Sequence, residues 1–250
     1  MSNLQNYMKK LLLCCIKNSK YWMVLFLFLS LNIMLKMFFV DIFSVSGDSM
    51  YPILKNGDYV VLCKFYGGMR LPRNVYEIPW IGSALYYLSD KEAVNNALEE
   101  SKKKNFLRFA ENFASLKSGD LVAFNNPLAL NNNVVKRCVG MPGDSICWHI
   151  EDNDELRMLS LFSVVPYKGM KISEKAFNYE EKELMNKNRA FRYDEKDSSY
   201  VAIDDCYIML GDNKTFSIDS RHWGVISKDL VIGKVIYVFS RGSNIGKLFN

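Results

Sequence analysis

The 250-residue chain has little histidine and no Cys-x-x-Cys pair. His149 and His222 are its only histidines. A zinc site normally takes its ligands from such residues at short, paired spacings, so we expect no bound metal. Export from the cytoplasm would permit a disulfide among four of the six cysteines, and the sequence leaves the pairing open. These four are Cys63, Cys138, Cys147 and Cys206.

The chain also lacks interleaved basic and aromatic residues, internal repeats and low-complexity stretches. Lysine and arginine together number 32 and aspartate and glutamate 27, which gives a net charge of +5. Part of this surplus lies before an apolar run near the N-terminus. We therefore expect no nucleic-acid partner, and attribute the charge to a surface that faces a membrane.

That apolar run, Tyr21 to Val40, is the most distinctive feature of the composition. A helix of about 20 residues, rising ~1.5 Å per residue, crosses a hydrocarbon layer of ~30 Å, so we predict a transmembrane helix over residues 21–40. Lysines precede the run, and aspartates follow it. By the positive-inside rule, we expect residues 1–20 in the cytoplasm and residues 41–250 outside it, in a single-pass protein of the cell (inner) membrane.

A cleavable signal peptide is the alternative interpretation of this N-terminus, because Ser44-Val45-Ser46 fits a small-x-small cleavage site. The apolar run is longer than the ~7 to 15 residues that a signal peptide uses. Cleavage after Ser46 would also detach the next segment, residues 47–54, from the membrane. We favour an uncleaved anchor.

Short runs of β-branched and apolar residues between turns dominate the remaining chain and predict strands. They occur at residues 59–64, 119–124, 133–140, 200–203, 207–210 and 231–239. Residues 71–88 indicate an ordered loop, and residues 89–118 a helix with Ser89 as its N-cap. The predicted fold class is mainly β, with one N-terminal transmembrane helix and one inserted helix.

Ser49 lies just beyond the span and is the candidate nucleophile. A serine nucleophile needs a base, and neither histidine is well placed, since His149 lies in a probable strand and His222 in a turn. Lysine can replace histidine where an apolar site lowers its pKa. A lysine in a strand usually faces solvent, but Lys136 lies among valines and Cys138, which provides such a site.

These segments together resemble the bacterial type I signal peptidases, membrane-bound serine proteases that remove signal peptides from exported proteins. The likeness covers the anchor and four blocks in the family's order, at residues 47–54, 119–124, 136–144 and 211–224. Each block alone is a weak signal, and the set is specific. The resemblance implies a β-rich extracytoplasmic catalytic domain with a variable accessory lobe, here about residues 145–205, and no cofactor.

By position, the resemblance implies that Ser49 is the nucleophile and Lys136 the general base. Ser217 matches the serine that orients the lysine, and Asp219 and Arg221 match a supporting ion pair. A long turn stabilised by Asp and Asn side chains is an alternative interpretation of residues 211–224, and it needs no catalysis.

The expected oxyanion site departs from part of the family, which has a serine where this chain has Gly47. The backbone N–H of Ser49 is then the expected donor, and a contribution from Ser46 stays open.

Substrate binding is expected at a strand edge, where an extended peptide places alternate side chains in pockets. The resemblance implies shallow apolar pockets that favour alanine. The matching wall positions, for which core packing is an equally good explanation, are Met50, Leu54, Val134 and Val135. The implied partners are exported preproteins with Ala-x-Ala-like cleavage sites, membrane lipid and, by proximity, the protein-export translocon.

Two other functions fit parts of the sequence. A catalytically inactive, membrane-anchored binding or scaffold protein would be expected to lose Ser49 or Lys136, and both are present. A self-cleaving Ser-Lys repressor would need a helix-turn-helix where this chain has its apolar span. We therefore predict a serine endopeptidase of the signal peptidase I type.

Overall fold

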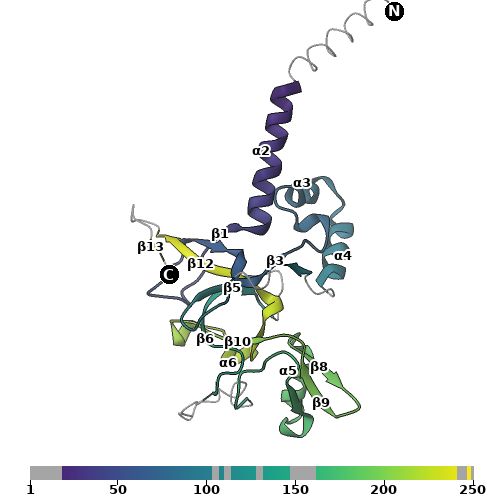
Figure 1. Cartoon of the computed structure of the whole chain (residues 1–250), viewed down its shortest axis with the longest axis vertical. Helices are drawn as coiled ribbons and strands as arrows, with labels where there is room; N and C mark the ends of the chain where they lie inside the picture. Colours follow the sequence, from purple (N-terminus) through teal and green to yellow (C-terminus); the bar gives the residue numbers. More distant parts are fainter. Residues whose placement is uncertain are drawn as a thin grey trace, which may run out of the picture.

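The computed structural model describes residues 19–102, 107–109, 114–127, 132–146, 162–240 and 247–248. Its longest helix, α2 (Ser19–Phe38), projects from the β-rich body in Figure 1. Within α2, Lys20–Phe38 is long and apolar enough to cross a membrane, and none of it is buried inside the protein. The predicted helix is confirmed, although it ends at Phe38 and not at Val40.

A side chain from the turn that follows β2 (Tyr59–Cys63) marks the end of α2. Lys64 Nζ donates to the carbonyl oxygen of Lys36 at 2.7 Å and to that of Met37 at 3.4 Å. A cation at this end satisfies carbonyls that have no partner in the helix and opposes the helix dipole. Only Phe39 then separates α2 from strand β1 (Val40–Ser44), so the chain passes from helix to sheet without a loop.

Eight strands form one antiparallel sheet in the order β1-β2-β12-β5-β6-β10-β11, with β13 paired to β12. Their bounds after β1 are β2 (Tyr59–Cys63), β5 (Leu121–Asn125), β6 (Asn133–Gly140), β10 (Cys206–Leu210), β11 (Ile226–Ser227), β12 (Val231–Phe239) and β13 (Lys247–Leu248). The strands predicted for this sheet are confirmed as β2, β5, β6, β10 and β12. The fold class is mainly β, as predicted.

Apolar side chains cover both faces of this sheet, and β5 contributes alternately to each. Leu121 and Ala123 belong to the core that buries Met50 and Leu54, which fixes the segment carrying Ser49. Val122 and Phe124 belong to a second core on the other face, together with Trp223 from the short helix α6 (Ser220–Trp223).

An insert leaves the sheet after β3 (Met69–Arg70) and returns at β4 (Arg108–Phe109), two strands that pair with each other. It contains the 3₁₀ turn η2 (Val75–Glu77) and the helices α3 (Ile81–Leu88) and α4 (Lys91–Lys102). The predicted loop over residues 71–88 is therefore wrong at α3, and the predicted helix over residues 89–118 is too long.

A contact between η2 and α3 accounts for the helix that was predicted as a loop. Gly82 of α3 lies so close to η2 that a Cβ on it would be 1.9 Å from the Tyr76 carbonyl oxygen. Ser89 is the C-cap of α3 and donates its N–H to Leu85, whereas we predicted it as an N-cap. The short α3 depends on this contact with η2, which periodicity along the chain does not reveal.

A smaller sheet in the order β7-β9-β8 and the helix α5 (Tyr179–Lys187) form a lobe within residues 145–205. Its strands are β7 (Lys171–Ser173), β8 (Phe191–Asp194) and β9 (Ser199–Ala202), and the last overlaps the strand predicted over residues 200–203 but is shifted by one residue. The lobe core continues into the main sheet through Ile208 and Val225.

Three of the four cysteines considered for a disulfide, Cys63, Cys138 and Cys206, are free thiols. Cys147 and His149 lie outside the described residues.

Candidate active site

Lys136 is buried in the middle of the sheet, on β6 between β5 and β10. It pairs across the strands with Val122, and it is only 3% exposed. Burial lowers the pKa of Lys136 to about 8, Asp219 acts in the opposite direction, and Arg221 adds to the lowering. About half of this amine is therefore neutral near pH 8, far more than for an ordinary lysine.

Ser217 connects Lys136 to a buried carboxylate. Lys136 Nζ donates to Ser217 Oγ at 3.0 Å, and Ser217 Oγ lies 2.7 Å from Asp219 Oδ2. Burial raises the pKa of Asp219, but hydrogen bonds from Arg221, the Gly211 N–H and Ser217 outweigh it, and the net pKa is lowered.

The ionised Asp219 fixes the direction of these hydrogen bonds. An ionised carboxylate only accepts, so Ser217 must donate its hydroxyl proton to Asp219 and accept from Lys136. One N–H of a neutral Lys136 is then engaged with Ser217. The lone pair of the amine remains for a different partner.

Arg221 holds the Asp219 carboxylate in a bidentate ion pair. Its Nε donates to Oδ1 at 2.9 Å and its Nη2 to Oδ2 at 3.0 Å. Asp219 is also the N-cap of α6 and accepts the Arg221 backbone N–H at 3.2 Å. The planar guanidinium and the cap together orient the carboxylate toward Ser217.

Ser49 is attached to the same turn through its main chain. The Asn213 N–H donates to the Ser49 carbonyl oxygen at 3.1 Å, and Asn213 Nδ2 donates to that of Asp48 at 3.1 Å. Gly211 gives both serines room: a Cβ there would lie 2.1 Å from Ser217 Oγ and 2.7 Å from the Ser49 carbonyl oxygen. Ser217 and the main chain of Ser49 therefore meet at a residue without a side chain, and Lys136 reaches this point through Ser217.

A cleft of ≈ 340 Å³ opens beside Ser49. Its walls come from residues 42–46, on and after β1, and from residues 133–135 at the start of β6, with Ser49 and Met50 between them in the chain. Apolar and polar groups share the lining about equally, with Ser44, Ser46, Ser49 and Asn133 as the polar residues. Among the described residues, no three His, Cys, Asp or Glu side chains are grouped as a metal site would need.

A family model described as "Signal peptidase, peptidase S26" matches residues 18–240. The matched region runs from α2 to the end of β12 and contains the cleft and the Lys136 network. The chain belongs to this signal peptidase family.

Relatives of this signal peptidase have low sequence identity to it, but they match most of its length. Signal peptidase I of Buchnera aphidicola subsp. Baizongia pistaciae is 23% identical over 82% of this chain and 71% of its own length. Signal peptidase I of Pseudomonas aeruginosa is 27% identical over 80% of this chain and 61% of its own length. Signal peptidase IB of Staphylococcus aureus is 28% identical over 66% of this chain and 82% of its own length.

A solved structure of a signal peptidase I from Enterococcus faecalis covers 49% of this chain and 97% of its own, at 19% identity and a TM-score of 0.27. The family model and the named relatives indicate a serine endopeptidase of the signal peptidase I type.

The residues predicted from the sequence fall into two adjoining groups in this signal peptidase. Ser217, Asp219 and Arg221 join Lys136, whereas Met50, Val134 and Val135 line the cleft with Ser49. Leu54 is fully buried in the core beneath the Ser49 segment. Gly47 is exposed, with a φ of +86° that favours glycine.

The sequence analysis missed the residues that hold the two groups together. Gly211 and Asn213 bring the Ser49 segment against the turn after β10. Arg137 then joins β6 to the same turn, since its Nε and Nη2 each lie 2.7 Å from a carboxylate oxygen of Asp212. All lie in the blocks that carry the resemblance, but the partner of each is distant in sequence.

Proposed function

We propose that this protein is a membrane-bound endopeptidase that removes N-terminal signal peptides from exported preproteins, with Ser49 as nucleophile and Lys136 as general base. The state of Lys136 is the main support: it is buried, its pKa is about 8, and one N–H is engaged by Ser217. Ser49 lies in a cleft and is tied to the same turn. No comparison supports an inactive scaffold.

In the proposed acylation, the lone pair of Lys136 Nζ takes the proton of Ser49 Oγ as that oxygen attacks the scissile carbonyl carbon. The carbonyl oxygen becomes an oxyanion, which the backbone N–H of Ser49, in the turn that begins at Gly47, is placed to stabilise. The Lys136 ammonium then gives the proton to the leaving amine as the C–N bond breaks. The signal peptide stays as an ester on Ser49.

In deacylation, Lys136 takes a proton from water while the water oxygen attacks the ester, and returns it to Ser49 Oγ as the ester bond breaks. Ser217 orients the amine throughout. Asp219 stabilises the transient ammonium, as its raising effect on the pKa of Lys136 indicates. Arg221 keeps that carboxylate in place.

The cleft supports an extended, small-residue substrate. Its walls are a strand and the start of another, whose main chains can pair with an extended peptide while alternate side chains point into the cleft. Met50, Val134 and Val135 present apolar surface there, which suits alanine at the first and third positions before the cleaved bond.

The anchor and the domain boundaries belong to the same proposal. We place residues 1–20 in the cytoplasm, residues 21–40 largely in the cell (inner) membrane, and residues 41–250 outside, with the accessory lobe at about 145–205. The exposed apolar helix α2 supports a single span. Contact with lipid and proximity to the export translocon follow from this placement.

Cleavage of a preprotein by the full chain in lipid vesicles tests the proposed activity. We expect mass spectrometry to show one cut, after the last alanine of an Ala-x-Ala site. A matched preprotein with aspartate at both alanine positions should remain intact, because the apolar surface of the cleft would have to bury two charges. Equal cleavage of the two preproteins, or cleavage of neither, contradicts the proposed function.

The pH dependence tests the general base. We expect kcat/KM to rise with pH along a limb with an apparent pKa of about 8, because protonated Lys136 has no lone pair to accept a proton. The Asp219→Asn variant removes a charge that raises this pKa, so its limb should move to lower pH. Asp197→Asn, which changes an exposed carboxylate paired with Lys171, is the control and should leave the limb in place. A profile without such a limb contradicts the role of Lys136.

A further inference from the structure

The insert carries the most exposed apolar helix outside α2. Helix α3 has the sequence IGSALYYL, without a charged residue. Tyr87 is 86% exposed, Leu88 83%, and Trp80, immediately before the helix, 63%. Burial of apolar surface stabilises by about 25 cal/mol per Å², so such a helix is ill-suited to bulk water and well suited to an apolar surrounding.

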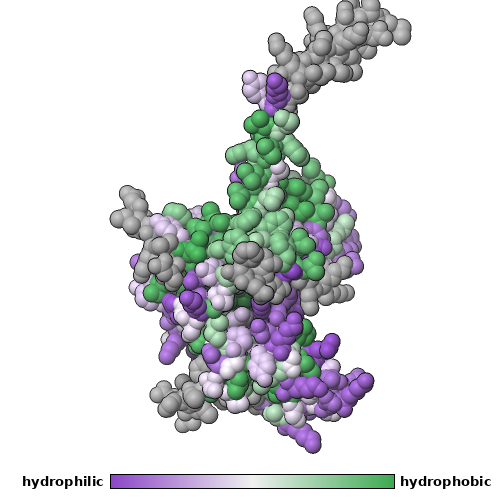
Figure 2. Space-filling model, viewed as in Figure 1, coloured by the Kyte–Doolittle hydropathy of each residue, from purple (hydrophilic) through white to green (hydrophobic). Residues whose placement is uncertain are grey.

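This helix lies beside the end of α2 where the chain enters the sheet. Lys36 Nζ, in the last turn of α2, lies 4.6 Å from the centre of the Trp80 ring. Phe38 at the end of α2 meets Phe109 of β4 edge to face, with ring centroids 5.3 Å apart. Figure 2 shows the apolar surface continuing from α2 to the region where Figure 1 places α3.

The other helix of the insert, α4, differs from α3 both in its charged composition and in its distance from the span. Helix α4 carries charged residues along its length, from Lys91 and Glu92 to Lys102. Figure 1 shows it on the side of α3 that is farther from the N-terminal end of α2. The insert thus carries its apolar helix nearer the span and its charged helix farther from it.

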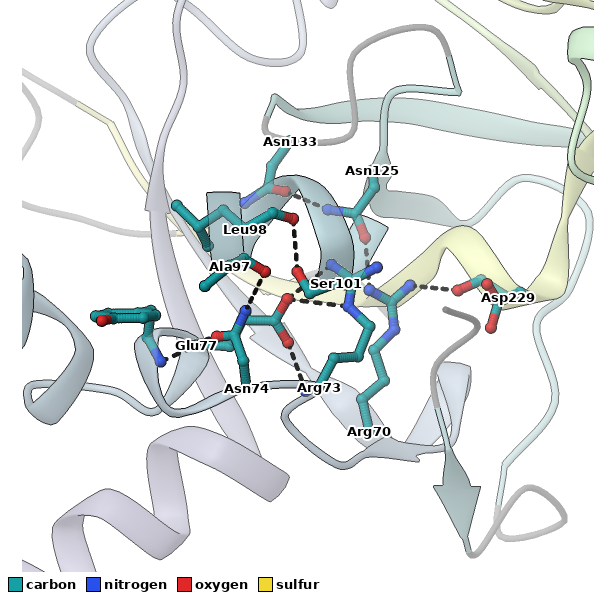
Figure 3. A network of polar contacts seen from close by, with 11 residues as sticks. Arg70, Arg73, Asn74, Glu77, Ala97, Leu98, Ser101, Asn125, Asn133 and Asp229 are labelled. Atoms are coloured by element: carbon teal, nitrogen blue, oxygen red, sulfur yellow. Dashed lines mark hydrogen bonds and ion pairs between the residues drawn. The ribbon is translucent and has the colours of Figure 1, made fainter. Parts of the chain in front are cut away.

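Polar contacts at its base fix the insert to the main sheet (Figure 3). Arg70 donates to Asn125 Oδ1 at 2.6 Å and to the Asp229 carbonyl oxygen at 2.9 Å. Arg73 pairs with Glu77 at 2.7 Å, and Asn74 Nδ2 donates to Ala97 of α4 at 3.4 Å. Together with the contact of Gly82 on η2, these bonds hold α3 at a defined height relative to α2.

We propose that α3 is an in-plane membrane contact, which lies at the lipid–water boundary of the leaflet from which α2 emerges. This inference rests on the proposed function in one respect, the insertion of α2 in a membrane. Its occupant is lipid because the apolar surface of α3 continues that of the span. Trp80, Tyr86 and Tyr87 are of the residue types that gather at this boundary.

A second contact would determine how the catalytic domain is oriented. A single helix leaves the domain free to rotate about the helix axis and to tilt. Because α3 and α2 are both fixed to the same sheet, insertion of both holds the cleft in one orientation toward the bilayer. Lys36 would then reach head groups from between the two helices, where it already lies against Trp80.

The immersion depth of a nitroxide at position 88 tests this inference in the full chain in vesicles. Cys14, Cys15, Cys63 and Cys147 are replaced by serine. Cys138 and Cys206 are left, because burial raises the pKa of both thiols and makes them unreactive. Leu88→Cys and, as a control on the lobe, Tyr179→Cys are then labelled; both native residues are 83% exposed.

We expect the label at position 88 to be more accessible to oxygen than to a water-soluble nickel chelate, and the label at position 179 to show the reverse. Equal aqueous accessibility at both positions overturns the inference. Shielding of position 88 from both reagents also overturns it, and points to a protein partner or a second copy.

Preprotein cleavage is measured on the same labelled samples. An aqueous label at position 88 together with normal cleavage would refute the membrane contact and leave the proposed function standing. A membrane-embedded label without cleavage supports the contact and contradicts the function.

The effect on catalysis gives an independent readout. We expect Tyr87→Glu with Leu88→Glu to slow cleavage of a membrane-inserted preprotein several-fold, but to leave cleavage of a short soluble peptide in detergent unchanged. The control Tyr179→Glu replaces a similarly exposed tyrosine on the lobe and should change neither rate. Equal loss on both substrates contradicts a role in membrane placement.

Discussion

The Lys136→Met variant is expected to lose about 10²- to 10⁴-fold in kcat/KM toward a preprotein, the range for removal of a general base, and to approach Ser49→Ala in activity. It should remain folded. Methionine fits a similar volume and carries no charge, while Ser217 still donates to Asp219. We therefore expect its free energy of unfolding to stay within about 1.5 kcal/mol of the wild-type value.

The matched control is the other buried lysine of the sheet. Lys234 lies in the same row, since it pairs with Val122 and Val122 pairs with Lys136. It is 7% exposed, and its Nζ lies 2.9 Å from Asp120 Oδ1. Lys234→Met should destabilise the fold by about 3 kcal/mol, because it leaves the buried Asp120 without its cation.

Comparison of these two variants separates catalysis from stability. Per folded molecule, Lys234→Met should cleave at close to the wild-type rate. Chemical denaturation gives the free energy of unfolding of each variant, and preprotein cleavage gives its activity. Comparable activity per folded molecule in the two variants would show that Lys136 is merely a buried structural lysine.

The Gly211→Ala variant is expected to lose about 100-fold in kcat/KM, the scale of a 1 Å displacement of reacting groups. A methyl group at position 211 would approach Ser217 Oγ to 2.1 Å and the Ser49 carbonyl oxygen to 2.7 Å, distances that no relaxed structure allows. The contact between Ser217 and the main chain of Ser49 at this position must therefore be disturbed. The loss should appear mainly in kcat, since the cleft walls at residues 42–46 and 133–135 are elsewhere in the chain.

Gly143→Ala is the control for this substitution. Gly143 has a φ of +86° and nothing within 4 Å of its Cβ position, so alanine there strains the backbone but touches no neighbour. We expect it to lower the melting temperature and to leave kcat unchanged. If the two variants lost stability to the same extent and Gly211→Ala kept its kcat, the packing of Ser49 against Ser217 would have no bearing on the reaction.

The sequence predicted those features that neighbouring residues determine. An unbroken apolar run specifies a helix such as α2, and short β-branched runs specify strands such as β12, whose predicted and observed bounds agree. The burial of Lys136 follows from its valine neighbours on β6. The grouping of Ser217, Asp219 and Arg221 with that lysine was predicted only through the resemblance, because it joins β6 to a segment after β10 that is far away in the chain.

The features that the sequence did not predict depend on contacts between separate elements. Helix α3 is short and packs on η2 through Gly82, and its own sequence, IGSALYYL, does not predict that contact. The ion pair of Asp120 with Lys234 depends on the register between β5 and β12. Gly211 lies in a recognisable block, but its importance appears only when the carbonyl of Ser49 is placed against it.

The direct connection between α2 and β1 fixes the distance between the end of the helix and the segment that carries Ser49. From Phe39 onward the chain is paired along β1 and then through Val45 and Gly57, so there is no slack between the helix and the segment of Ser49. With α2 in the membrane, as proposed, this connection would hold Ser49 at a fixed distance from the bilayer surface. In the proposed reaction a scissile bond would reach Ser49 only after a set number of residues had left the lipid, so substrates would be selected by distance as well as by side chain.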